Sequence, residues 1–197
     1  MKKQIVSLVA AVLFSMAVTS VSAQSVQYPS FHFGIRGGVS VNSSSISGTD
    51  LSGGSRTFPY GGLAADFKIA SIPLYLETGV YYMNKGYKFE IYDRTYKEND
   101  HFIHMPLLAS YHIYINDNMA IQPFAGFVGG YLTESKGFGG AIRLGCGINF
   151  GRLYANLGYD IGVTKHQASD RYYNYSIGKL SYSTFFATIG FNFLGSR

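Results

Sequence analysis

The sequence contains no tryptophan and a single cysteine, Cys146, in 197 residues. A lone cysteine cannot form a disulfide within the chain. On the β-strand expected around it, Cys146 falls on the outward apolar side, so we interpret it as a small hydrophobic residue and not as a reactive or metal-binding thiol. The five histidines are scattered without the spacing of metal ligands, and no phosphate-binding glycine loop is present. The sequence therefore predicts no metal site and no cofactor.

Charge and long apolar runs are also scarce. Lys and Arg number 16 and Asp and Glu number 11, and two of the basic residues stand at the extreme N-terminus. The remaining excess of three positive charges is too small to indicate nucleic acid as a partner. Beyond residue 23, no stretch has the ~20 apolar residues of a transmembrane helix. If this chain spans a membrane, β-strands must do so.

The first 23 residues have the three parts of a secretory signal peptide. Lys2 and Lys3 form the basic region, residues 6–18 form the apolar core, and Val21-Ser22-Ala23 is a cleavage site of small residues. The core is shorter than a spanning helix, which disfavours a retained membrane anchor. We expect four parts: a signal peptide over residues 1–23, an N-terminal segment over 24–30, one domain over 31–193 and a tail over 194–197.

Apolar residues alternate with small or polar residues in eight segments of this domain. A period of two is typical of a β-strand whose two faces differ. The segments are near the ~9–11 residues that a tilted strand needs to cross a bilayer. They are Phe31–Val41, Tyr60–Ile69, Leu74–Lys85, Phe102–Tyr111, Met119–Tyr131, Gly140–Phe150, Leu153–Val163 and Tyr182–Phe193.

The connections between these segments alternate in length. Long polar loops are expected over residues 42–59, 86–101 and 165–181, with a shorter one over 133–139, and tight links over 70–73, 116–118 and 151–152. A membrane barrel sorts its connections in this way, because long loops face the outside of the cell and short turns face the periplasm. We predict an all-β fold: an eight-stranded antiparallel up-and-down transmembrane β-barrel in the outer membrane, with both mature termini in the periplasm.

Aromatic residues gather near the expected strand ends, as at the two interfaces of a bilayer. The alternative fold is a soluble lipocalin-like barrel, which keeps its apolar side chains inside. The charged set on the opposite face, which includes Arg36, Glu77 and Asp160, decides against it. The two expected girdles are Tyr82, Tyr131 and Tyr159 at the long-loop rim, and Phe31, Tyr111, Phe150 and Phe193 at the short-turn rim.

The interior of an eight-stranded barrel is just filled by its own side chains, so no open pore is expected. Counting from the turn at residues 151–152 places Arg143 opposite Asp160. Counting across residues 70–73 places Asp66 opposite Glu77, and two such carboxylates require a cation nearby. We interpret this set as a buried salt-bridge core; a proton or ion relay, or a gated channel, is the functional alternative. The expected interior polar cluster is Arg36, Asp66, Lys68, Glu77, His104, Arg143 and Asp160.

Pro106 stands in the middle of the segment Phe102–Tyr111. A proline cannot donate a backbone hydrogen bond to a neighbouring strand. We therefore expect a bulge or locally broken pairing at Pro106, with an architectural role.

Two segments resemble a known family. Phe102-Ile103-His104-Met105-Pro106-Leu107-Leu108-Ala109-Ser110-Tyr111 resembles the "YLEIPLLLKY" signature of PorT-like outer-membrane β-barrels, and Phe124-Ala125-Gly126-Phe127 followed by Gly129-Gly130-Tyr131 is similar to the "aGpy" strand of that family. The resemblance implies a small eight-stranded barrel of a Gram-negative outer membrane. The family has an acidic residue in place of His104 and a basic residue in place of Ser110, so an ion pair between those positions is absent here. The founding member assists a protein-secretion machine, a role that we do not transfer.

The last long loop holds two further candidate sets. His166, Ser169 and Asp170 are the residue types of a hydrolytic triad, but they are close neighbours in a polar loop with nothing evident to hold them in register. We therefore expect a solvated loop and no enzyme. The neighbouring Tyr172, Tyr173 and Tyr175 suit recognition of a glycan or protein, or else fold down to extend the girdle.

The sequence thus predicts an integral outer-membrane barrel with a filled interior and a structural or surface-recognition role through its extracellular loops. Its expected partners are the lipid bilayer and a protein or glycan at the loops, and we expect a monomer. The alternative is an accessory component of a protein secretion or transport system.

Overall fold

The computed structural model describes residues 29–47, 54–91, 94–134, 136–164, 166–169 and 176–195. The expected signal peptide, most of the N-terminal segment before Phe31, and Asp170, Tyr172, Tyr173 and Tyr175 lie outside the described residues. Within these ranges, no helix is long and apolar enough to cross a membrane.

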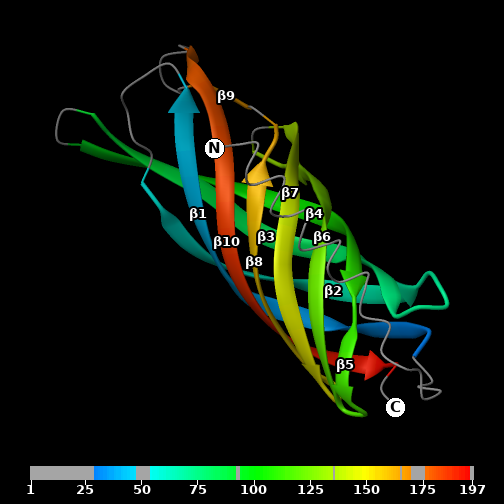
Figure 1. Ribbon diagram of the computed structural model, residues 1–197. Coiled ribbons are helices and arrows are strands. Elements are labelled where there is room, and N and C mark those ends of the chain that lie inside the picture. Colours follow the sequence, from blue (N-terminus) through cyan, green and yellow to red (C-terminus); the bar gives the residue numbers. More distant parts are fainter. Residues whose placement is uncertain are drawn as a thin grey trace, which may run out of the picture.

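Eight long antiparallel strands form one sheet in which each strand pairs with the next (Figure 1). Two short strands extend it: β5 (Ile113–Asn116) pairs with β6, and β9 (His166–Ser169) pairs with β10. The long strands are β1 (Phe31–Ser47), β2 (Arg56–Lys68), β3 (Leu74–Ile91), β4 (Arg94–Tyr111), β6 (Met119–Leu132), β7 (Gly137–Phe150), β8 (Leu153–Gly162) and β10 (Ser176–Leu194).

The sheet closes on itself because the last strand also pairs with the first. The seam runs from Phe33 opposite Leu194 to Ser47 opposite Lys179, with one register shift between Phe33 and Gly34. Figure 1 shows β1 and β10 side by side along the barrel wall. A closed sheet has no unpaired edge to leave in hydrocarbon, where an unsatisfied backbone group costs several kcal/mol. The predicted closed eight-stranded barrel is confirmed.

Apolar side chains cover the outside of this barrel. Val80 is 52% exposed, Leu157 57% and Ile189 73%, while the residues that alternate with them point inward and are buried. A soluble monomer rarely exposes apolar side chains over so continuous a surface. Apolar outside and polar inside is the arrangement of a transmembrane barrel, and it excludes the lipocalin-like alternative.

Aromatic side chains lie at both ends of the apolar surface. Tyr82, Tyr131 and Tyr159 are exposed on the outer face near the long-loop rim. At the short-turn rim, Phe150 and Phe193 are exposed, and Phe31 and Tyr111 are half-buried. These positions are those expected for interfacial girdles.

The prediction of a long loop over residues 86–101 is wrong. Strands β3 and β4 continue through it and stay paired from Asn84 opposite His101 to Ile91 opposite Arg94. The resulting hairpin projects past the neighbouring strands on the left of Figure 1. Strand β1 likewise continues to Ser47 and β10 begins at Ser176. The strands outlast the apolar alternation because, outside the bilayer, a paired strand no longer needs an apolar face.

Pro106 interrupts the pairing of β3 with β4. The ladder joins Thr78 to Leu107 and resumes with Tyr81 opposite His104, without a change of register. The Thr78 hydroxyl donates a hydrogen bond of 2.9 Å to the Pro106 carbonyl at this gap. Of the two expectations, locally broken pairing is confirmed and no bulge forms here.

Candidate functional site: the polar interior of the barrel

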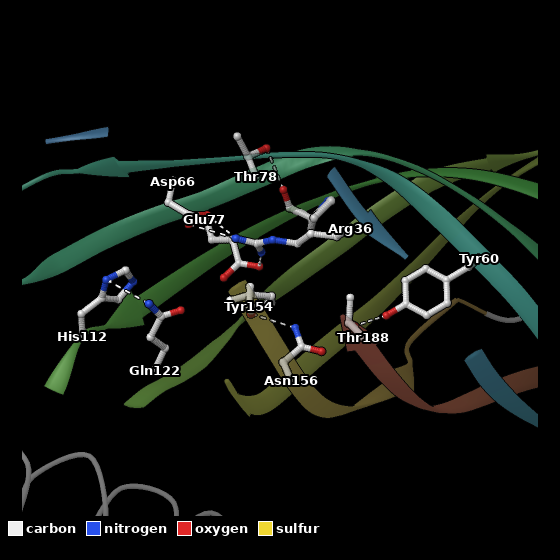
Figure 2. A network of polar contacts seen from close by, with 11 residues as sticks. Arg36, Tyr60, Asp66, Glu77, Thr78, His112, Gln122, Tyr154, Asn156 and Thr188 are labelled. Atoms are coloured by element: carbon white, nitrogen blue, oxygen red, sulfur yellow. Dashed lines mark hydrogen bonds and ion pairs between the residues drawn. The ribbon is translucent and has the colours of Figure 1, made fainter. Parts of the chain in front are cut away.

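Three strands bring one arginine and two carboxylates together inside the barrel. Arg36 on β1 points inward, and Asp66 on β2 lies opposite Glu77 on β3, as the strand counting predicts. Arg36 Nη1 donates to Glu77 Oε1 at 2.5 Å, and Nη2 donates to Asp66 Oδ2 at 2.9 Å (Figure 2). All three side chains are buried. We call these residues the lower charge cluster.

An aromatic ring completes the surroundings of Arg36. The guanidinium carbon lies 3.9 Å from the centre of the Tyr154 ring, and the Tyr154 hydroxyl accepts a hydrogen bond of 2.8 Å from Asn156 Nδ2. Figure 2 shows Asp66 and Glu77 beside the guanidinium and Tyr154 on another side of it. A cation over an aromatic face and in contact with carboxylates is stabilised without bulk water. The guanidinium is therefore held in one orientation by side chains of three other strands, β2, β3 and β8.

A second ion pair joins β7 to β8. The register places Arg143 opposite Asp160, as expected from the turn at residues 151–152. Arg143 Nε donates to Asp160 Oδ1 at 2.7 Å and Nη2 donates to Oδ2 at 2.8 Å, a bidentate geometry. The Arg143 guanidinium also lies 4.3 Å from the centre of the Phe186 ring. We call Arg143 and Asp160 the upper ion pair.

Little free space separates the two charged groups. A cavity of about 10 Å³ lies between Arg36, Glu77 and Arg143, with room for one water molecule at most. A cluster of buried apolar side chains fills the surrounding interior, namely Tyr60, Ala64, Tyr81, Met83, Leu108, Phe124 and Phe186. Glycine makes this packing possible at Gly158, where an added Cβ would collide with the Phe186 ring. Side chains of the described residues thus fill the barrel centre around the two charged groups.

The other two residues of the expected cluster lie elsewhere. His104 is buried between the Tyr81 and Phe102 rings, with ring centres at 5.4 and 5.1 Å, and its nitrogens have no hydrogen-bond partner among the described residues. Lys68 is half-buried at the short-turn end of β2, opposite Tyr75. The structure therefore brings together Arg36, Asp66 and Glu77, and separately Arg143 and Asp160. His104 lies in an aromatic stack, and Lys68 lies at the short-turn end of β2.

The interior polar cluster expected from the sequence did not include a layer of polar residues near the short turns. The Tyr75 ring stacks on His112 with centres 3.8 Å apart, and the Tyr75 hydroxyl donates to the Pro29 carbonyl at 2.7 Å. Gln122 Nε2 lies 3.3 Å from His112 Nδ1, a contact drawn in Figure 2. Tyr75 and Gln122 alternate with outward residues and could have been found by strand parity. His112 follows the expected strand end at Tyr111, so parity alone could not find it.

A second layer of polar residues that the expected cluster did not include lies toward the long loops. Lys85 is buried, with its ammonium nitrogen 3.9 Å from the centre of the Phe102 ring and 5.7 Å from that of Tyr182. Above the upper ion pair, the Thr184 hydroxyl donates to Asn42 Oδ1 at 2.6 Å. The interior is therefore polar at both ends and holds its paired charges in the middle. In the described part of the chain, no three His, Cys, Asp or Glu side chains are grouped to hold a metal ion.

Comparison with known proteins points to one class. A sequence-family model described as "Outer membrane protein beta-barrel domain" matches residues 22–141. The chain is similar to the crystal structure of the outer membrane protein OprG from Pseudomonas aeruginosa, with 12% identity, coverage of 84% of this chain and 97% of that chain, and a TM-score of 0.55. At this identity the likeness concerns the fold alone.

Two further solved structures resemble the chain more distantly. Ail, the attachment invasion locus protein of Yersinia pestis, has 12% identity, covers 85% of this chain and 100% of its own, and gives a TM-score of 0.39. Neisserial surface protein A has 16% identity, covers 82% of this chain and 97% of its own, and also gives 0.39. No curated protein sequence matches the chain.

Proposed function

The chain belongs to the outer membrane protein β-barrel domain family, and from that membership we propose that it is a plugged outer-membrane barrel that acts through its extracellular loops. The barrel is a rigid, non-conducting scaffold embedded in the bilayer. Its role is structural or one of surface recognition, with a protein or glycan as the partner at the loops. We propose that it acts as a monomer and has no catalytic activity.

The observation that carries this proposal is the filled interior. The lower charge cluster, the upper ion pair and the aromatic side chains around them occupy the barrel centre, and the cavity between them is about 10 Å³. The interior of an eight-stranded barrel is just wide enough for its own side chains, so we expect this barrel to act at its rims. By the rule that long loops face outward, the rim with the β3–β4 hairpin and strand β9 is the extracellular one.

Within this rim, we propose that Tyr172, Tyr173 and Tyr175 make the recognition contacts. Tyrosines provide rigid contact area together with a hydroxyl for hydrogen bonding. The triple variant Y172S/Y173S/Y175S should reduce binding of expressing cells to immobilised glycans or host-surface proteins by about tenfold or more, if these contacts carry at least ~1.4 kcal/mol. The matched control is Y92S, a tyrosine change in the connection between β3 and β4, which should leave binding unchanged.

Single-channel recording in planar bilayers tests the plugged barrel itself. The purified protein should give no conductance steps above bilayer leakage, because packed side chains leave a cavity of only about 10 Å³ at the barrel centre. Stable steps in the wild-type protein would contradict the proposal and favour a transport role.

The second candidate is an accessory role in protein secretion, which we base on the PorT-like features of Phe102–Tyr111 and Phe124–Tyr131. On this reading the barrel is a PorT-like member of the family and acts through a periplasmic or membrane partner. Deletion of the gene separates the two candidates. Loss of secreted proteins from cells with an intact envelope supports the accessory role, whereas unchanged secretion supports the recognition role.

A further inference from the structure

The outer surface of the barrel is not uniformly convex. An apolar groove of about 1070 Å³ lies over the seam between β1 and β10 and extends onto the neighbouring strands. Its outward-facing walls are the side chains of Ile35, Val39, Ile148, Phe150, Leu153, Ala155, Ile189 and Phe191. We call it the seam groove. It is continuous with the surface that the barrel presents to the bilayer.

The floor of the seam groove consists of backbone where side chains would otherwise stand. Gly37 and Gly61 lie opposite each other on β1 and β2 and both face outward. A Cβ added at Gly37 would come no closer than 3.6 Å to the nearest atom, the Tyr60 carbonyl oxygen, and one at Gly61 would lie 3.4 Å from the Arg36 carbonyl oxygen. Packing therefore does not require glycine at these two positions, in contrast to Gly158. Glycine in a strand weakens the strand, so this pair needs another reason.

The position of the groove within the membrane points to its occupant. The groove reaches Phe150 and Leu153, which flank the short turn that contains Gly151 and Arg152. Arg152 is exposed at this turn. Because the short turns face the periplasm, this end of the groove lies at the headgroup level of the periplasmic leaflet. A guanidinium at that level matches the phosphate of a phospholipid in charge and geometry.

We propose that the seam groove holds one phospholipid of the periplasmic leaflet, with an acyl chain along the Gly37–Gly61 floor and the phosphate at Arg152. Inside a bilayer, association depends on van der Waals packing, since the surrounding lipid tails are as apolar as the protein surface and provide no hydrophobic driving force. An acyl chain in the seam groove contacts side chains on both flanks as well as the floor. It therefore makes more van der Waals contacts than an acyl chain on a convex part of the barrel wall. This lipid is therefore retained when the surrounding lipids exchange.

Filling the groove tests this proposal. Wild-type protein, G37L/G61L and the control G129L are purified from membranes in mild detergent, and bound phospholipid is counted by native mass spectrometry. Gly129 also faces lipid and has open space around it, but lies on β6 away from the seam. The wild type and G129L should retain about one phospholipid per barrel, and G37L/G61L should retain about tenfold less. A heat-shifted band on an unboiled gel checks that each variant is folded.

A second variant tests the headgroup contact without changing the groove. R152Q removes the charge at the short turn and should lower phospholipid retention severalfold, while the G37L/G61L effect persists in its background. The proposal is overturned by a wild type that retains no phospholipid, by equal losses in G129L and G37L/G61L, or by unchanged retention in R152Q. It is also overturned if filling the groove converts a dimer to a monomer, because the occupant is then a second copy of the chain.

Discussion

At the scale of single residues, the charges of the lower charge cluster and of the upper ion pair are tolerated in the interior because each contacts an opposite charge. Arg143 and Asp160 satisfy one another through two parallel hydrogen bonds, and Arg36 contacts both Asp66 and Glu77. Removing both charges of a buried pair is often nearly neutral, whereas removing one leaves its partner unpaired at a cost of about 3–5 kcal/mol. The stability of this barrel should therefore depend on matched pairs and not on any one charge.

The upper ion pair allows a direct test of this dependence. D160L and R143M should each lower the free energy of unfolding in lipid vesicles by about 3–5 kcal/mol, and R143M/D160L should lower it by much less than the sum of the two. Urea titration followed by the heat-shifted gel band measures these differences. D117N, which changes an exposed carboxylate at the β5–β6 turn, should stay within about 0.5 kcal/mol of the wild type. Additive losses in the double variant would contradict the paired-charge account.

Gly158 in the barrel interior should not tolerate a larger residue. An added Cβ at Gly158 would collide with the Phe186 ring. G158A should therefore destabilise the barrel by about 1–3 kcal/mol, the usual range for overpacking. The same unfolding titration should show that F186L, a smaller side chain at the contact, recovers part of the loss in G158A/F186L. G129A has open space for its new methyl group and should leave the midpoint unchanged.

At the scale of elements, the alternation of residues predicted the membrane-spanning part of every strand. The expected segments and the observed strands agree to within a residue or two at the short-turn rim, for example at Leu74, Met119 and Leu153. Tight turns fix the register there, so Arg143 opposite Asp160 and Asp66 opposite Glu77 could both be counted from the sequence. The inward parity of each strand follows from the same count.

The strand ends at the opposite rim could not be predicted in this way. Residues 86–101 are rich in charge, and charge in a run of residues is normally a loop signal. Backbone pairing between β3 and β4 extends through them because water, unlike lipid, accepts any side chain on either face of a hairpin. The lower charge cluster also could not be assembled from register alone, since Asp66 lies four positions along β2 from Gly62, the register partner of Arg36. His104 and Lys68 share the inward parity, and yet they lie in an aromatic stack and at the short-turn end of β2, respectively.

The projecting β3–β4 hairpin should be accessible at the cell surface. A short epitope inserted after Tyr92, in the connection between the two strands, should leave the barrel folded and should bind antibody on intact cells. The matched control is the same epitope after Asp117 in a short turn, which should bind antibody only after the outer membrane is permeabilised. Binding in the reverse order would mean that the barrel is inserted with the opposite orientation.

At the scale of the whole molecule, closure, inverted polarity and a filled core act together. The seam between β1 and β10 removes the sheet edges, and the outward side chains are apolar over the membrane-spanning height. Inside the barrel, the lower charge cluster and the upper ion pair each join opposite charges. Each of these features depends on the others. A barrel with charged side chains on its outer face could not enter a bilayer, and unpaired charges in its interior would require water around them. The loops are then free to vary on a fixed support, which is how such scaffolds acquire different functions.

The most direct test of this account uses the one cysteine of the chain. Cys146 is exposed on the outer face of β7, so a nitroxide spin label attached to it in reconstituted vesicles should face hydrocarbon. Collision measurements should show high access to molecular oxygen and little access to a water-soluble nickel chelate, and the reverse for a label at N118C in a C146S background. A Cys146 label that is open to the nickel chelate, or immobilised and shielded from both reagents, would show that the outer wall does not face lipid and would contradict the central claim.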